Sequence, residues 1–475
     1  MAGMSLSTGL ISGMDTGTLI SQLMQVEANP QTLLKTKLTG TQTDAAAYRA
    51  VNTRFDALRS AAEALTKAAT WSTTKATSSL PAAVTATSGS SALPGSLTFT
   101  VAELATTHSV IGPELTTTVP ATPTVPASPA NVPFGTQITV TDAQGLNPQT
   151  FAVGGSGSLA DAVSAINKNT ALGLTATTMQ VADGTFRLQV TAGGSGAART
   201  FSLTTDTGHS FTPLTAGQDA ELSVGTTNPF TVRSATNTFT GLLADTTITA
   251  TTTTATPVTV NVAGDPDAVA AKVSALISAA NGVLSTVSSY TSSSSDTATL
   301  KGDSTLRSLS SQVLSAVASA VGSDGSAAVA GLQLNRDGTI AFDSAKFVAK
   351  LRADPGLVQR VFAGTPAGPG ADGVVGGGDD VADVPGIAGR LQAIGQQASD
   401  TTTGSLTLLA KSKDSTAKDL AARVADWDLR LALRKESLTR QFTAMETALG
   451  SLQNKSTWLS AQLSSLPSWS QSSKS

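Results

Sequence analysis

Residues 420–466 read LAARVADWDLRLALRKESLTRQFTAMETALGSLQNKSTWLSAQLSSL. Apolar side chains recur in this stretch at intervals of three and four residues, which is the heptad pattern of a coiled coil. The pattern is interrupted at Arg434 and Ser456, and the step from Leu438 to Phe442 adds a second interval of four, a stutter. Because the stretch contains no proline, it predicts one long helix with an apolar seam.

Such a helix needs a partner. About a dozen buried side chains contribute on the order of 24 kcal/mol, whereas ordering each residue costs about 1 to 2 kcal/mol. The N-terminal region offers a second seam after Asn29 and Pro30, where a helix is predicted to start. Its positions are Leu34, Leu38, Thr41, Ala45, Tyr48, Val51, Phe55, Leu58, Ala62 and Leu65.

A shorter predicted helix precedes this one, with Asp15 as its N-cap. Its apolar stripe comprises Leu19, Ile20, Leu23, Met24 and Val26. We therefore expect the two ends of the chain to pair, and the residues between them to be carried as an insertion.

We assign two roles to the seam residues. The segment from Leu420 to Leu438 is expected to pack on residues 48–65 as a stem. The stem-packing residues are Tyr48, Phe55, Leu58, Leu420, Val424, Trp427 and Leu431. A subunit or filament interface is predicted at Leu19, Leu23, Val26, Met445, Leu449, Leu452, Leu459, Leu463 and Leu466. The alternative is an intramolecular bundle with no assembly role.

Composition limits the possible partners and compartments. The chain has 475 residues, enough for two to four domains, and a net charge of −3, which gives no footprint for nucleic acid or an anionic membrane. We find neither an N-terminal secretion signal nor an unbroken apolar run long enough to span a bilayer. Cysteine is absent and only 4% of residues are aromatic, which favours an extracellular protein without disulfides. Export without a cleaved signal peptide reconciles these observations.

The spacing of apolar residues changes between residue 69 and about residue 300. Alternating apolar and Thr-rich positions predict antiparallel strands, with Ala182-Asp183-Gly184 as a turn between two of them. One helix is predicted after Ser158 as N-cap. Prolines at every third position predict a polyproline II spacer between two β-rich parts, with an SH3-type ligand as the alternative. These prolines are Pro120, Pro123, Pro126 and Pro129.

From Asp265 onward the pattern is helical again. Asp303 or Ser304 is predicted to cap one helix, and Asp343 or Ser344 another. Between these two helices, residues 332–342 predict a hairpin with its turn at Asp337-Gly338.

The predicted fold class is α+β multidomain: terminal helices form a coiled-coil stem, and antiparallel β-rich head domains are nested between them. At the N-terminal end, residues 1–30 are predicted to form a leg and export segment, and residues 31–68 a stem helix. In the middle, residues 69–119 and 217–264 form a first β head domain, residues 120–133 the spacer, and residues 134–216 a second, inserted β head domain. At the C-terminal end, residues 265–419 form a helical and hairpin domain, residues 420–467 the stem and leg helix, and residues 468–475 a disordered tail.

A search for catalytic and metal sites predicts none. No Gly-Lys dipeptide occurs, so the phosphate-binding P-loop pattern is missing. His108 and His209 are the only histidines, and we expect both to be ordinary surface residues. A Gly- and Asp-rich segment at residues 364–383 does not repeat the nonapeptide pattern of calcium-binding proteins, so we interpret it as a solvated loop. No cofactor is expected.

Several stretches together resemble the flagellar hook-associated protein 2 family of filament-capping proteins. The resemblance runs nearly end to end, and it depends on the order and spacing of motifs that are individually weak. The motifs are Ser12-Gly13-Met14-Asp15-Thr16, Gln22-Leu23-Met24, Val26-Glu27 and Pro30; Leu104-Ala105-Thr106; Ala165-Ile166-Asn167; Gly302-Asp303-Ser304-Thr305-Leu306-Arg307; Arg336-Asp337-Gly338; and Phe342-Asp343. The proline-rich spacer and the Gly/Asp loop are not part of the resemblance.

The resemblance implies a structural cap at the distal end of the bacterial flagellar filament, where flagellin folds and inserts. It implies a homo-oligomeric ring, expected to be a pentamer, that contacts flagellin and the hook-filament junction proteins. It also implies type III export with a flagellar chaperone and a location at the filament tip, outside the cell. The chain is not expected to be an enzyme, or to bind nucleic acid or membrane.

Two other function classes remain open. The Thr-rich β head could act in adhesion, either alongside the cap role or alone as a secreted adhesin that binds host glycans or mucin. A secreted glycosidase would need paired carboxylates in a cleft, and the few acidic residues of the β region argue against one.

Overall fold

The computed structural model describes residues 15–119, 127–368 and 383–465. The chain divides into two compact units: residues 1–68 with 270–475, and residues 69–269 between them. One unit is thus inserted into the other along the sequence. With long terminal helices and several antiparallel sheets, the structure confirms the predicted α+β fold class with nested β-rich parts.

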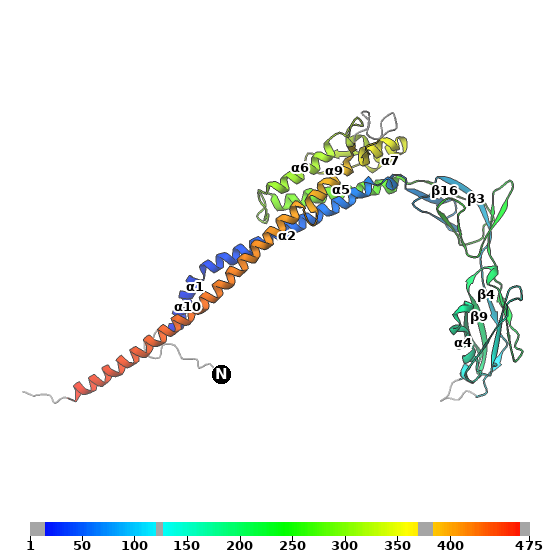
Figure 1. Ribbon diagram of the computed structural model, residues 1–475, viewed down its shortest axis with the longest axis horizontal. Helices are drawn as coiled ribbons and strands as arrows, with labels where there is room; N and C mark the ends of the chain where they lie inside the picture. The colour runs from blue at the N-terminus through cyan, green and yellow to red at the C-terminus, as the bar shows by residue number, and fades with distance from the viewer. Residues whose placement is uncertain (1–14, 120–126, 369–382, 466–475) are drawn as a thin grey trace, which may run out of the picture. The chain divides into compact units, whose positions relative to one another are not determined.

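The first unit is mainly helical (Figure 1). Its helices are α1 (Thr16–Glu27), α2 (Asn29–Thr66), α5 (Pro266–Thr291), α6 (Ser304–Ala318), α7 (Ser344–Ala353), α8 (Pro355–Ala363), α9 (Ile387–Ser399) and α10 (Ser405–Ser464), with the 3-10 turn η4 (Ala327–Ala330). It also holds two short hairpins, β17 (Leu332–Leu334) with β18 (Ile340–Phe342), and β19 (Gly364–Thr365) with β20 (Val384–Pro385).

Local capping signals decide where several helices begin. The Asp15 carboxylate accepts a hydrogen bond from the Thr18 backbone N–H at 3.0 Å, and Asp303 and Asp343 cap α6 and α7 in the same way. Each satisfies one of the donors that a helix leaves unpaired at its N-terminus. The three predicted caps and the predicted hairpin at residues 332–342 are therefore confirmed.

Helix α5 is long and apolar enough to cross a membrane by length and composition. The burial of its side chains argues against a membrane span. Val273, Leu276, Ala280 and Val283 are fully buried within the protein. A second feature also ties α5 to the unit. The Asn281 carboxamide donates to Ile340 O and accepts from Ile340 N–H, both at 2.8 Å. We therefore interpret α5 as a core helix.

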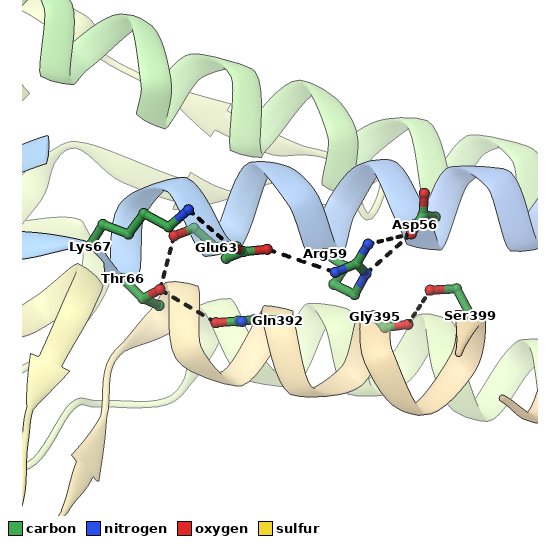
Figure 2. Close-up of polar contacts among 8 residues, drawn as sticks. All are labelled: Asp56, Arg59, Glu63, Thr66, Lys67, Gln392, Gly395 and Ser399. Carbon is green, nitrogen blue, oxygen red and sulfur yellow. Dashed lines mark hydrogen bonds and ion pairs between the residues drawn. The ribbon is translucent and has the colours of Figure 1, made fainter. Parts of the chain in front are cut away.

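Helices α2 and α9 lie side by side, as Figure 2 shows, and their backbones approach closely at Gly395. A Cβ added to Gly395 of α9 would lie 2.9 Å from the Arg59 Cβ and 3.0 Å from the Phe55 carbonyl oxygen of α2. Further along the two helices, the Thr66 hydroxyl lies 3.5 Å from the Gln392 side-chain oxygen. On α9 itself, the buried Ser399 hydroxyl donates to Gly395 O at 2.8 Å. The absence of a side chain at Gly395 is what lets the two backbones approach.

The inserted unit consists of strands with one α-helix of ten residues. Its elements are α3 (Ala68–Trp71, which begins at the border), β1 (Thr74–Ser78), β2 (Val84–Ser88), β3 (Gly95–Glu103), β4 (Thr107–Ile111), β5 (Leu115–Thr116), η1 (Pro129–Asn131), β6 (Gln137–Asp142), β7 (Gln149–Ala152), α4 (Leu159–Lys168), η2 (Thr170–Leu172), β8 (Leu174–Ala182), β9 (Thr185–Ser195), η3 (Ala197–Arg199), β10 (Phe201–Thr205), β11 (Thr212–Thr215), β12 (Ala220–Val224), β13 (Phe230–Ser234), β14 (Thr238–Thr240), β15 (Thr246–Ala250) and β16 (Val258–Gly264).

These strands enclose two separate hydrophobic cores. Sheets β1-β16-β3-β12-β13 and β14-β15-β2 pack around Phe99, Leu222 and Ile248. Sheets β11-β4-β9-β5 and β10-β6-β7, with β8 paired to β9 and α4 packed beside it, enclose Ile166 and Leu188. All the pairings are antiparallel, as the alternating sequence pattern predicts.

The strand pairing corrects the predicted role of the spacer. Strand β4 pairs with β9, and its residue Val110 belongs to the same core as Ile138 and Val140 of β6. Residues 120–133 therefore connect two segments of one β-rich part and do not separate two parts. The border predicted at residue 119 lies instead between β3 and β4. The prediction erred because it relied on a local proline signal, whereas long-range pairing decides the border. Residues 120–126 themselves lie outside the described part.

The predicted N-cap of α4, Ser158, is confirmed, and the Asp161 carboxylate also takes part in the cap. The Ser158 hydroxyl accepts from Asp161 N–H, and the Asp161 carboxylate accepts from Ser158 N–H, which together make a capping box. The same carboxylate accepts from the Ser156 backbone N–H and hydroxyl, both at 2.9 Å. Hydrogen bonds from Ser158 and then Ser156 lower the pKa of Asp161 below its ordinary value of 3.8.

Substituting Gly395 with alanine should destabilise the helical unit. In an exposed helix this change stabilises by about 0.5 to 1 kcal/mol, but here the new methyl group would press on the α2 backbone. We expect a net loss of about 1 to 3 kcal/mol in the free energy of unfolding, measured in urea. Gly389→Ala, on the same helix with only Pro385 Cβ at 3.6 Å, is the matched control and should be neutral or stabilising. Equal effects at both positions would refute the close approach.

The Asp161 cap should make α4 sensitive to acid. Because the folded-state pKa is depressed, the contribution of the carboxylate is fully present above about pH 4, the value of an unfolded Asp. It is lost as the pH falls through the lower folded-state pKa. The difference in unfolding free energy between the native chain and Asp161→Asn should therefore be largest at neutral pH and shrink in acid. Urea denaturation followed by circular dichroism at several pH values checks this, and a constant difference would contradict it.

Candidate assembly surface on the terminal helices

Helices α2 and α10 run antiparallel, and polar contacts fix their register (Figure 1). The Gln31 carboxamide donates to Val424 O at 3.4 Å and also bonds Asp428. Further along, Lys413 pairs with Asp44 at 2.7 Å, and Arg49 pairs with Asp414. Residue 31 therefore lies level with 424–428, and residues 44–49 lie level with 413–414.

This register corrects the predicted packing of the stem. The segment from Leu420 to Leu438 lies along α1 and the first part of α2, and not on Tyr48 to Leu65. The second half of α2 packs against α9, where Phe55 and Arg59 meet Gly395. The heptad pattern identified the buried face of α2, whereas on the seam of α10 only Leu420 and Leu438 are buried. It could not fix the register, because every heptad presents a similar seam.

The predicted stem-packing residues are buried to different degrees. Tyr48, Phe55, Leu58 and Leu420 are buried, whereas Val424, Trp427 and Leu431 are half-buried. The Tyr48 hydroxyl donates to the Asp303 carboxylate at 2.5 Å, and burial, followed by this hydrogen bond, raises the pKa of Tyr48. The tyrosine thus stays protonated and links α2 to the N-terminus of α6.

Helix α1 lies beside α10 and uses only part of its apolar surface there. Ile20 is buried, and together with Met24 it lines a groove of about 320 Å³ against Leu431 of α10. The predicted interface residues of α1 point elsewhere: Leu19, Leu23 and Val26 are exposed. These three side chains form the outer surface of α1.

The interruption of the seam at Arg434 has a structural explanation. The Arg434 guanidinium lies 3.0 Å from the Glu27 carboxylate at the end of α1. Both side chains are largely in solvent, so the pair contributes at most about 1 kcal/mol. The position of this ion pair is more informative than its strength. The pair lies where α1 ends and α2 takes over the contact with α10.

Beyond Leu438 helix α10 continues without a buried side chain. Residues 439–464, here called the free segment, extend for about 39 Å at 1.5 Å per residue, and all of them are exposed except Phe442, Glu446 and Gly450, which are half-buried. Five predicted interface residues lie on it: Met445, Leu449, Leu452, Leu459 and Leu463. They are between 37 and 62% exposed. Leu466, the sixth, lies outside the described residues.

The free segment is only marginally stable as an isolated helix. A lone helix gains little beyond its backbone hydrogen bonds, and its nucleation is costly. Burying its half-exposed apolar residues would add roughly 1 kcal/mol for each side chain. The arrangement therefore favours a helix that becomes fully ordered when a second surface covers it.

The prediction missed several exposed apolar residues on the same helices. Leu429 and Leu433 lie four residues apart on α10, outside the seam, and Leu33 and Trp458 are also largely exposed. The i, i+4 spacing of the leucine pair was a usable signal for a second apolar patch on the paired part of α10. The heptad seam does not include these two positions.

The histidines lie far from this surface in the sequence, in the inserted unit. His108 is buried, contrary to the prediction, with its Nε2 2.9 Å from Phe201 O and its Nδ1 accepting from Gly217 N–H. His209 stacks obliquely on Phe134, with 5.6 Å between ring centroids. The part of the chain that the structure describes has no group of three or more His, Cys, Asp or Glu side chains placed to hold a metal ion.

A solved structure shares this fold. The D1-D2-D3 domains of the flagellar cap protein FliD from Escherichia coli match with 24% identity and a TM-score of 0.55, covering 78% of this chain and 99% of that chain. FliD (HAP2) from Pseudomonas aeruginosa matches with 19% identity and a TM-score of 0.32, covering 42% of this chain and 92% of that one. A search of curated proteins found no match.

Family models identify the sequence more directly. The model for the flagellar hook-associated protein 2 N-terminus matches residues 12–108, which include α1, α2 and the first strands. The model for the C-terminus of the same family matches residues 217–454, which make up half of the chain and include most of α10. The chain therefore belongs to the flagellar hook-associated protein 2 family.

Proposed function

We propose that this protein is the structural cap at the distal end of the bacterial flagellar filament. The family assignment supports this role, and so does the fold shared with a protein described as a flagellar cap. The observation that carries the proposal is the free segment of α10, a helix whose apolar residues at heptad spacing are exposed from Met445 to Leu463. A structural protein that docks on other helices needs such a segment.

The proposed mechanism follows from the marginal stability of the free segment. Apolar helices that gain most of their stability from a partner dock and release at modest cost. The free segment would then insert among helices of the filament end, and would withdraw and dock again as each flagellin subunit folds and inserts beneath the cap. The covered part of α10 keeps the rest of the chain folded during these steps.

We propose that the cap is a homo-oligomeric ring, and a pentamer is our expectation for it. The outer surface of α1, with Leu19, Leu23 and Val26, offers a second apolar contact besides the free segment. Flagellin and the hook-filament junction proteins are the proposed neighbours. Export through the flagellar type III pathway, with a dedicated chaperone and no cleaved signal peptide, would deliver the chain to the filament tip.

Replacing apolar residues of the free segment should abolish docking without unfolding the protein. We expect the triple variant Leu452→Ser, Leu459→Ser and Leu463→Ser to keep the circular dichroism spectrum and melting temperature of the paired helices. It should no longer appear as a plate at filament ends in negative-stain images, and cells carrying it should not swim. The matched control is Gln453→Ser, Lys455→Ser and Gln462→Ser on the same helix. Normal capping by the leucine variant would refute the docking role.

A secreted adhesin that uses the Thr-rich β-rich unit is the alternative function, and adhesion to host glycans or mucin could also accompany the cap role. Loss of swimming distinguishes the two, because a protein that acts only as an adhesin would leave motility intact. We expect deletion of the gene to abolish swimming in soft agar and complementation with the full-length chain to restore it. Swimming cells that adhere poorly would favour the adhesin.

A further inference from the structure

Strand β8 is an edge strand of unusual length. It pairs with β9 from Leu174 to Ala182. On the opposite side of β9, Val190 pairs with β4 and Phe186 pairs with β5. Among the described strands, β9 is the only neighbour of β8, so one long side of β8 faces away from the sheet. A nine-residue edge is a ready template for another strand.

The sequence of β8 contains none of the residue types that usually prevent an edge strand from pairing. It reads LTATTMQVA, without a charged residue, a proline or a glycine. Natural edge strands are usually protected by charge, proline or covering loops. On the solvent face of β8, Met179 is 41% and Val181 is 45% exposed. The strand thus combines β-forming residues with an open apolar end.

One side chain occupies the open edge. Asn167, in the last turn of α4, donates from Nδ2 to Ala176 O at 3.0 Å and accepts at Oδ1 from Ala176 N–H at 2.8 Å. This donor and acceptor pair is what one residue of a neighbouring strand would supply. The adjacent Ile166 is fully buried in the core, which holds the end of α4 against β8. The carboxamide therefore replaces a missing strand at Ala176.

The geometry shows how much of the edge Asn167 closes. In an antiparallel ladder, alternate residues direct their backbone groups to the same side. Thr178 and Gln180 therefore share the outward direction of Ala176, until the irregularity that follows Gln180. With Ala176 occupied, these two residues offer too short a ladder for stable pairing. Without the carboxamide, the ladder would extend through Ala176, Thr178 and Gln180.

We propose that the β8 edge is a latent pairing site for the same edge of a second copy of this chain, and that the Asn167 carboxamide keeps it closed. A second copy fits because an antiparallel pair of β8 strands brings two uncharged, Thr-rich sequences together with no charge repulsion. Asn167 therefore prevents an association between inserted units that the terminal helices do not govern. This inference does not depend on the proposed cap function.

Removing the carboxamide tests the proposal. We expect full-length Asn167→Ala, measured by light scattering over a range of concentrations, to reach twice the mass that the native chain shows under the same conditions. Hydrogen exchange at the Thr178 and Gln180 amides should slow as this mass appears. The double variant Asn167→Ala, Met179→Lys should return to the native mass, because a lysine on the edge opposes pairing. Asn167→Asp, which loses the donated bond but places a charge at the edge, should also keep the native mass.

Two results would overturn the proposal. The first is that Asn167→Ala keeps the native mass at every concentration while the Thr178 and Gln180 amides exchange freely. The second is that the double variant associates as strongly as the single variant. Because both variants lose the same two hydrogen bonds, that result would assign the association to partial unfolding of the inserted unit. Melting curves of the two variants, expected to coincide, establish that their stability is equal.

Discussion

Everything in the helical unit depends on helix α2 having two different partners along its length. Its first part lies against α10, and its second part runs beside α9 so closely that Gly395 cannot carry a side chain without displacing α2. Both partners come from the last hundred residues of the chain. The hydrophobic core of this unit therefore forms only when the two ends of the sequence meet, and residues 69–269 have to fold as a separate body.

The same constraint divides α10 into two parts with different physical properties. The part up to Leu438 is held by α1 and α2, through partly buried leucines and through polar pairs such as Lys413 with Asp44. The free segment has the same heptad chemistry, but its apolar residues from Met445 to Leu463 are exposed. One continuous helix thus joins a packed part to an exposed apolar surface. In the proposed cap, this arrangement would keep the chain folded while leaving an apolar surface for docking.

Local signals in the sequence predicted what depends on local interactions. Asp15, Ser158 and Asp303 were recognisable as caps, and the Asp337-Gly338 hairpin was recognisable as a turn, because each acts within a few residues. The register of α10 against α2 depends on contacts almost four hundred residues apart, such as Gln31 with Asp428. Heptads alone do not specify such a register. The β4–β9 pairing was missed for the same reason, since a proline-rich run suggested a border that long-range pairing overrides. The role of Asn167 depends on where α4 ends relative to β8, which no motif states.

The pairing of the two chain ends has a consequence for folding kinetics. Synthesis delivers the N-terminus first, so α2 is complete long before α9 and α10 exist. During that interval the face with Val51, Phe55 and Leu58, fully buried in the folded chain, is exposed to water. The entropy of closing so long a loop adds only about 5 kcal/mol, so closure itself is not prohibitive. Folding is limited instead by the interval before α10 is made, because the apolar face of α2 must not bind other apolar surfaces during that time.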